Sequence, residues 1–326
     1  MNLKKIGLST SGLAFNMGVT GKGTDRVNSN SWSLEKFIDF AASQGFGGIE
    51  APLMRFVPNL EPSRLEALKT KLREYEMFFV MDAEKVLDID EITALIPLAK
   101  KFDSPIIRIK SSNVLSCDRK KIGKAWKDHV KNCIQTLKQI APSLMEAGIK
   151  ISIENHQDLD SSDLAQIIQE VGSDVIGVNF DIGNAFSVCE DALNFAQKLG
   201  SSINNIHLKD YKIYKSEEGF RLVRCPLGLG SVNFKDILPF LEKTTPGAKM
   251  VIELGALEAR NIAWLAPNFW EEIQPRSEEE KLLFSKLLEK EIIKVSDNSW
   301  QTPWEKKESK NEISAYEISG LESSIK

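Results

Sequence analysis

Eight short apolar segments with the character of β-strands recur along the chain, and stretches of helical periodicity separate them. The strand candidates are residues 5–10, 47–52, 78–83, 105–111, 149–155, 176–181, 204–209 and 249–254. The helical stretches are residues 33–45, 62–76, 89–102, 120–148, 161–172, 191–200 and 233–244. This alternation predicts an α/β protein with helices packed around a parallel sheet.

The number of repeats favours one architecture. Eight βα units that are complete by about residue 257 match the roughly 250 residues of a (β/α)8 barrel, or TIM barrel. A doubly wound sheet is the main alternative, but no G-x-G-x-x-G follows the first strand. We therefore predict a catalytic (β/α)8 barrel domain over residues 1–260.

The sequence changes character beyond Arg260. Residues 261–326 contain a charged helical stretch with an apolar stripe, followed by a polar end. We expect a C-terminal helical extension on the outside of the barrel and then a flexible polar tail. Trp264, Phe269 and Trp270 would either form a lid over the barrel mouth or pack the extension onto the barrel.

Composition excludes several classes of function. The chain has 326 residues, of which 42% are hydrophobic and 27% charged, as in an ordinary globular protein. The net charge of −4 provides no basic field for nucleic acid, and no apolar run is long enough to cross a membrane. The four cysteines are scattered without a C-x-x-C pair, which argues against disulfides and thiolate zinc. We expect a cytoplasmic protein with reduced thiols that acts on a small molecule.

Four polar residues each end an apolar run, one in each of the fifth to eighth strand candidates: Glu154, Asp181, His207 and Glu253. In a TIM barrel these strand ends converge on one mouth, where catalytic residues lie. Three carboxylates and one imidazole form an oxygen-rich set that suits Mn²⁺, Mg²⁺ or Co²⁺. Any one of them alone is explained by a structural role, but four in one register predict a divalent-metal site.

Strand alternation adds two residues to the candidate site, because side chains two apart point to the same side. His156 is in phase with Glu154, and Lys209 is in phase with His207. Both are candidates for substrate binding. The alternatives are a hydrogen bond from His156 to a metal ligand and an ion pair of Lys209 with a carboxylate of the metal site or with Glu50.

Two basic residues on the fourth strand extend the site further. Arg108 and Lys110 alternate with isoleucines, so both side chains point inward if the isoleucines face the helices. Cations near the mouth indicate an anionic substrate, a carboxylate or a phosphate. Pairing with acids inside the barrel is the alternative explanation.

Five short motifs together resemble the sugar phosphate isomerase/epimerase family, which comprises the xylose-isomerase-like and endonuclease-IV-like barrels. They are ISIENH (151–156), FDIGN (180–184), IHLKD (206–210), PLGLG (226–230) and VIEL (251–254). The resemblance spans roughly residues 3–258. It implies that the four strand-end residues bind a divalent metal, often manganese, in a barrel that is often a homo-oligomer. It also implies that Glu154 and Glu253 are the catalytic acid/base pair. Glu50 resembles a glutamate often found at the end of the second strand in the family, and it is either a substrate-binding residue of the site or the partner of a basic neighbour.

The reaction that this resemblance implies is isomerisation or epimerisation of a carbohydrate or sugar acid. A metal held by a carbonyl and the adjacent hydroxyl acidifies the intervening C–H and stabilises an enediolate. Two carboxylates then exchange protons with the carbon. The result is an aldose–ketose isomerisation or an inverted stereocentre.

The chain departs from parts of the family. Its three histidines cannot build the multi-zinc cluster of the DNA-repair branch, which is thereby excluded. Asn184 stands where ketose 3-epimerases often carry a substrate-binding histidine, and it remains a candidate to bind a sugar hydroxyl. The same groups also suit a metal-dependent lyase. A decarboxylase or dehydratase of a keto sugar acid or an inosose-like substrate is therefore the alternative function.

Overall fold

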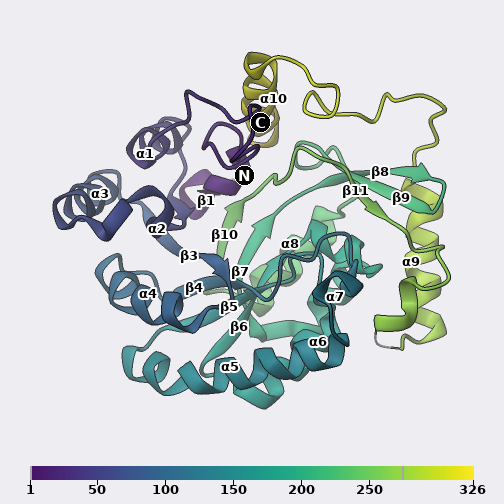
Figure 1. The fold of residues 1–326 in the computed structure, drawn as a ribbon, viewed down its shortest axis with the longest axis horizontal. Coiled ribbons are helices and arrows are strands. Elements are labelled where there is room, and N and C mark those ends of the chain that lie inside the picture. Colours follow the sequence, from purple (N-terminus) through teal and green to yellow (C-terminus); the bar gives the residue numbers. More distant parts are fainter. Residues whose placement is uncertain (1, 274) are drawn as a thin grey trace.

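The predicted strands form one closed parallel barrel. In the computed structural model, which describes residues 2–273 and 275–326, the neighbouring strands follow the order β1-β10-β7-β6-β5-β4-β3-β2. Their bounds are β1 (Ile6–Ser9), β2 (Gly48–Ala51), β3 (Phe78–Val86), β4 (Ile106–Lys110), β5 (Lys150–Glu154), β6 (Ile176–Asp181), β7 (Ile203–Leu208) and β10 (Lys249–Ile252). Pairing of Gly7 with Val251 closes the sheet. The (β/α)8 prediction is confirmed, with the strands in the centre and helices outside (Figure 1).

Each predicted helical stretch forms a helix between two barrel strands. These helices are α1 (Leu34–Ser43), α3 (Pro62–Glu74), α4 (Ile89–Lys101), α5 (Trp126–Ala147), α6 (Ser161–Val171), α7 (Ala192–Leu199) and α8 (Phe234–Thr244), and a short helix α2 (Leu53–Phe56) follows β2. Local sequence sets where several of them begin. Asp160 and Asp163 form a capping box at the start of α6, and Ser33 accepts a hydrogen bond from the backbone N–H of Lys36 in α1.

Alternation within the strands separates the core from the site. In β5, Ile151 and Ile153 are buried in the hydrophobic core, whereas Glu154 belongs to the polar interior of the barrel. Gly48 of β2 is required by close packing, because a Cβ atom there would lie 2.5 Å from the ring of Phe78. The polar side chains at the strand ends therefore lie together at one mouth of the barrel.

A second, three-stranded sheet that the sequence did not predict lies beside the barrel. Its order is β11-β9-β8, and it consists of β8 (Tyr211–Ser216), β9 (Gly219–Arg224) and β11 (Arg260–Ile262). The hairpin of β8 and β9 occupies the connection between β7 and α8. Because β11 pairs with β9, the segment around residue 260 belongs to this sheet. The domain division at residue 260 stays a prediction.

The C-terminal region contains two helices rather than one. Helix α9 (Glu278–Glu291) is the predicted charged helix, and its Phe284 packs against Phe220 of β9 at 5.9 Å between ring centroids. Trp264 packs on both of these rings and so helps to join α9 to β9. Among the described residues, no helix is long and apolar enough to cross a membrane.

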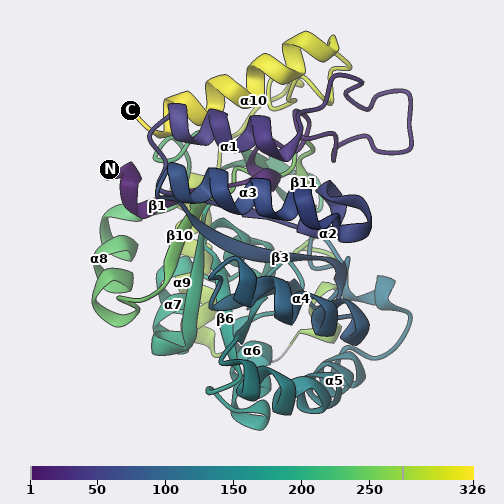
Figure 2. The same cartoon turned by 90° about the vertical axis from the view of Figure 1, so that its left-hand side faces the viewer.

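The expectation of a flexible polar end is wrong for residues 310–324. They form helix α10 (Lys310–Ser324), which begins with a capping box between Ser309 and Glu312. The polar composition indicated a solvated segment, but one of its acids, Glu317, is completely buried. Helix α10 lies at the edge of the molecule in Figure 2, and it packs on the short 3-10 helix at Thr10–Leu13.

Candidate metal centre

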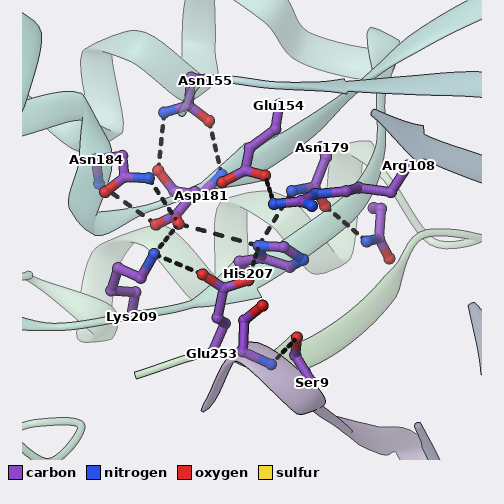
Figure 3. Close-up of polar contacts among 12 residues, drawn as sticks. Ser9, Arg108, Glu154, Asn155, Asn179, Asp181, Asn184, His207, Lys209 and Glu253 are labelled. Carbon is purple, nitrogen blue, oxygen red and sulfur yellow. Dashed lines mark hydrogen bonds and ion pairs between the residues drawn. The ribbon is translucent and has the colours of Figure 1, made fainter. Parts of the chain in front are cut away.

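The four predicted ligands converge on one point inside the barrel mouth. Glu154 ends β5, Asp181 ends β6, His207 lies on β7, and Glu253 directly follows β10. Each offers one ligand atom, and these atoms all lie within 4.8 Å of one another. All four side chains are buried (Figure 3). Three carboxylates and one imidazole are therefore held together by four separate strands.

Hydrogen bonds fix the orientation of the imidazole. His207 Nε2 lies 2.9 Å from Glu50 Oε1, on the side away from the other ligands. His207 Nδ1 lies 3.1 Å from Glu253 Oε2 and 3.9 Å from Asp181 Oδ2. Nδ1 is consequently the ring nitrogen that faces Asp181 and Glu253, and Asn179 Nδ2 lies 3.2 Å from it.

Two asparagines hold Asp181. The side chain of Asn155 accepts a hydrogen bond from the backbone N–H of Asp181 at 2.7 Å and donates one to its carbonyl oxygen at 2.8 Å. Asn184 Nδ2 donates to Asp181 Oδ2 at 2.8 Å. These contacts lock the end of β6 to β5 and aim the carboxylate at the cluster. Asn155 was missed from the sequence, although it directly follows Glu154 in the motif ENH.

Two buried cations neutralise the carboxylates. Arg108 donates to Asp82 at 2.7 Å and also contacts Glu154. Lys209 donates to Glu253 at 2.9 Å and also contacts Asp181. Both were predicted to bind substrate, with pairing to acids as the alternative, and in the structure both are paired. Asp82, at the end of the third strand candidate, was not predicted as a site residue.

The crowding of charge shifts the acid–base properties of the cluster. Burial raises the pKa of Asp181 to about 7, although the charge of Lys209 opposes this shift. Burial likewise raises the pKa of Glu154, against the charge of Arg108. Burial alone would lower the pKa of His207, but the carboxylates of Glu50 and Glu253 raise it to about 10. Without a dication, protons and cationic side chains must therefore balance the acids.

Buried oxygens without partners indicate that the cluster fits a metal ion. Among the described residues, Glu154 Oε1 and Glu253 Oε2 accept no hydrogen bond, although His207 Nδ1 lies 3.1 Å from the latter. Such orphaned acceptors are costly unless a ligand satisfies them. An ion bound by oxygens and one nitrogen would do so, and Mn²⁺, Mg²⁺ and Co²⁺ prefer this donor set.

A cavity of about 240 Å³ opens beside the ligand cluster. On one side it is lined by Glu253, Arg108, Lys110 and His156. Burial lowers the pKa of His156, reinforced by Lys110, and its Nδ1 has no hydrogen-bond partner among the described residues. Lys110 forms no ion pair with any residue that the structure describes. A neutral imidazole and an unpaired ammonium are thus available to a ligand in this cavity.

Three other predicted substrate-binding residues contact ligands of the cluster. Glu50 contacts His207, Lys209 contacts Asp181 and Glu253, and Asn184 contacts Asp181. None of the three belongs to the described lining of the 240 Å³ cavity. Contact of these three residues with substrate stays a prediction.

A larger hollow of about 490 Å³ lies elsewhere in the described chain. It is lined by residues of the loop after β4, such as Lys120, and by Arg260 and Phe269. None of the four candidate ligands lines it. The smaller cavity is the candidate substrate site, because Glu253 of the ligand cluster lines it.

The fold and the cluster together define a class, the (β/α)8 barrels that carry strand-end carboxylates and an imidazole at their mouth. Within this class, the model of one family, described as "Xylose isomerase-like TIM barrel", matches residues 38–268. The chain belongs to this family. The predicted family resemblance is thereby confirmed, and related structures include sugar epimerases.

Individual relatives are distant. A 3-oxo-isoapionate decarboxylase of Pectobacterium atrosepticum is 20% identical over 226 residues, which are 69% of this chain and 78% of that protein. A D-psicose 3-epimerase of Clostridium cellulolyticum, solved with D-tagatose, is 14% identical with a TM-score of 0.59, covering 88% of this chain and 99% of its own. A Mycobacterium smegmatis barrel in complex with magnesium is 19% identical with a TM-score of 0.55, covering 78% and 89%. At these identities the solved structures establish the fold alone.

Proposed function

We propose that the chain is a divalent-metal-dependent isomerase or epimerase of a carbohydrate or sugar acid. The observation that carries the proposal is the pair Glu154 and Glu253, whose unpartnered oxygens lie in one ligand cluster beside a cavity. Epimerases among the structural relatives support the reaction class, and the magnesium complex supports the metal. Manganese is our choice of resident ion, because three carboxylates and one imidazole suit it.

Glu154, Asp181, His207 and Glu253 would hold the ion. When bound, it would polarise a substrate carbonyl and thereby acidify the neighbouring C–H. Glu154 and Glu253 are the groups that take and return the proton, because they come from different walls of the barrel, at β5 and after β10. Arg108 and Lys209 keep the two carboxylates in place through their ion pairs.

A metal-dependent lyase is the second candidate, and Lys110 favours it. In the cavity, Arg55 pairs with Glu84 and Arg108 with Asp82, which leaves the ammonium of Lys110 without a partner among the described residues. An acid group on the substrate would satisfy it. A keto sugar acid of this kind can lose CO₂, the reaction named for the 20% identical decarboxylase.

A mass-spectrometric screen separates the two candidates. The wild-type protein with Mn²⁺ would be incubated with ketoses, keto sugar acids and inososes in ²H₂O. We expect a product that is an isomer of the substrate, except that one hydrogen on the carbon next to the carbonyl is replaced by deuterium. Release of CO₂ or water would establish the lyase instead. Activity in Glu154→Gln equal to that of the wild type would contradict both candidates.

Two further parts of the proposal concern the setting of the enzyme. We propose a cytoplasmic location, because all four cysteines are buried free thiols, as in proteins of a reducing compartment. Assembly into a homo-oligomer rests on the family resemblance. Gel filtration with light scattering tests the latter directly.

A further inference from the structure

Helix α10 inserts a buried carboxylate under the N-terminal loop of the barrel. The side chain of Glu317 is fully buried. Its oxygens accept hydrogen bonds from the backbone N–H of Phe15 at 3.0 Å, from the backbone N–H of Asn16 at 2.9 Å, and from Asn16 Nδ2 at 3.0 Å. Arg224 Nη1 lies 3.6 Å from Glu317 Oε1 and partly balances its charge.

The loop that Glu317 holds forms a wall of the substrate cavity. Residues 10–20 follow β1 and belong to its connection with α1. Five of them line the 240 Å³ cavity: Thr10, Ser11, Ala14, Val19 and Thr20. Phe15 and Asn16 lie in the middle of this stretch. Three N–H groups bound to one carboxylate therefore fix the backbone of the wall.

The segment before α10, which contains Thr302 and Trp304, supports a second part of the cavity wall, formed by the residues that follow Glu253. Gly255 and Ala256 line the same cavity. The chain that follows them is bound by Thr302, whose Oγ1 donates to the carbonyl oxygen of Leu257 at 2.6 Å, and Trp304 packs with Leu257 in a small apolar cluster. Phe15 and Ile313 belong to this same cluster, so both walls share one support.

We propose that residues 302–324 are part of the active-site architecture and that Glu317 is a positioning residue for substrate binding. Glu317 acts through the loop of residues 10–20 and does not touch the ligand cluster. Neither that loop nor α10 lies within the family match of residues 38–268, so this wall is not part of what the match describes. The assignment of a substrate to the cavity rests on the proposed function.

The test compares buried and exposed positions of one helix. Glu317→Gln keeps the size of the side chain but removes the charge that binds the N–H groups. Ser314→Ala is a milder change at the same loop, because Ser314 Oγ donates to Asn16 Oδ1 at 2.6 Å. Glu322→Gln and Ser319→Ala are the matched controls, since both side chains are exposed on α10.

Two measurements decide the outcome. We expect amide hydrogen exchange in residues 12–20 to become about tenfold faster in Glu317→Gln and to rise also in Ser314→Ala, while α4 exchanges as before. With a substrate from the screen, KM should rise about tenfold, with kcat and bound metal nearly unchanged. If Glu317→Gln does not fold, Ser314→Ala carries both measurements.

Unchanged exchange in the loop, or faster exchange with an unchanged KM, would overturn the inference. A fall in apparent kcat in proportion to the unfolded fraction, with KM unchanged, would indicate a structural role only and would also overturn the inference. The exchange experiment needs no substrate. It therefore decides whether Glu317 holds the wall even if the screen finds no turnover, an outcome that counts against the proposed function.

Discussion

The Nε2 atom of His207 lies 2.9 Å from Glu50 Oε1, and this contact turns Nδ1 toward Asp181 and Glu253. A histidine that binds a metal through one nitrogen is commonly held through the other by a carboxylate. The Glu50 carboxylate thus occupies the position of an orienting partner. Glu50 lies in the second strand candidate, 157 residues before His207. The spacing of the strand-end residues therefore did not link the two side chains.

The first prediction concerns this contact. Glu50→Gln should weaken metal binding by about 10- to 100-fold, because the amide cannot hold the imidazole as the carboxylate does. Competition with a chromophoric chelator measures the affinity. Glu84→Gln, which changes a carboxylate at the cavity but outside the cluster, is the control. An affinity in Glu50→Gln equal to that of the control would show that Glu50 does not orient His207.

The second prediction concerns Lys209. Lys209→Met removes the cation between Asp181 and Glu253, and breaking a buried ion pair costs about 3–5 kcal/mol of unfolding free energy. Mn²⁺ should restore part of this loss, since a ligand at a hundredfold excess over Kd stabilises by about 2.7 kcal/mol. Urea unfolding with Mn²⁺ and with chelator measures both effects. No dependence of stability on Mn²⁺ in either protein would contradict the metal site.

The third prediction concerns substrate charge. Lys110→Met should raise KM for sugar acids by about tenfold or more and leave KM for uncharged ketoses unchanged, because an unpaired ammonium in the cavity binds only the acid. Lys100→Met, an exposed change on α4, is the control. Equal effects on both substrate types would remove Lys110 from the acid-binding role.

The fourth prediction concerns the contact between α1 and α3. Arg64 donates to Glu35 through Nε at 2.8 Å, and this hydrogen bond lowers the pKa of Glu35 from 4.5 to about 2. A lowered carboxyl pKa contributes stability that is full above pH 4.5 and is lost as the pH falls toward 2. Since both side chains are about one-third exposed, Glu35→Gln should cost only about 0.5 kcal/mol.

Urea unfolding from pH 2 to pH 7 measures the effect, with Glu146→Gln as an exposed control. The stability difference between Glu35→Gln and wild type should be largest at pH 7 and vanish near pH 2. A difference that stays constant over this range would mean that the Glu35 carboxylate is not the source of the stability.

The barrel could be predicted from sequence because its signals are local. Each apolar run, such as residues 149–155, reports a strand by itself, and residues that share a strand end reach the same mouth. For this reason Glu154, Asp181, His207 and Glu253 could be placed together before any contact was known. The four residues are far apart in the sequence, and they meet only because each lies at the same end of its strand.

The features that were missed depend on pairing between distant segments. β8 and β9 have alternating polar and apolar residues, but the sheet that they form is completed by β11, which lies about 40 residues further along the chain. Helix α10 looks like a solvated polar segment because its buried acid, Glu317, finds its partners about 300 residues away at Phe15 and Asn16. Likewise, the pairing of Arg108 with Asp82 joins two strands and could not be read from either segment alone, and substrate binding by Arg108 stays a prediction.

The metal content of the purified protein tests the central claim most directly. After incubation with Mn²⁺ and dialysis, elemental analysis should find about one divalent ion per wild-type chain. Asp181→Asn should retain less than about one-tenth of it, because the cluster loses a ligand charge, whereas the exposed control Asp174→Asn should retain all of it. A wild-type chain without a bound ion, or full occupancy in Asp181→Asn, would contradict the account.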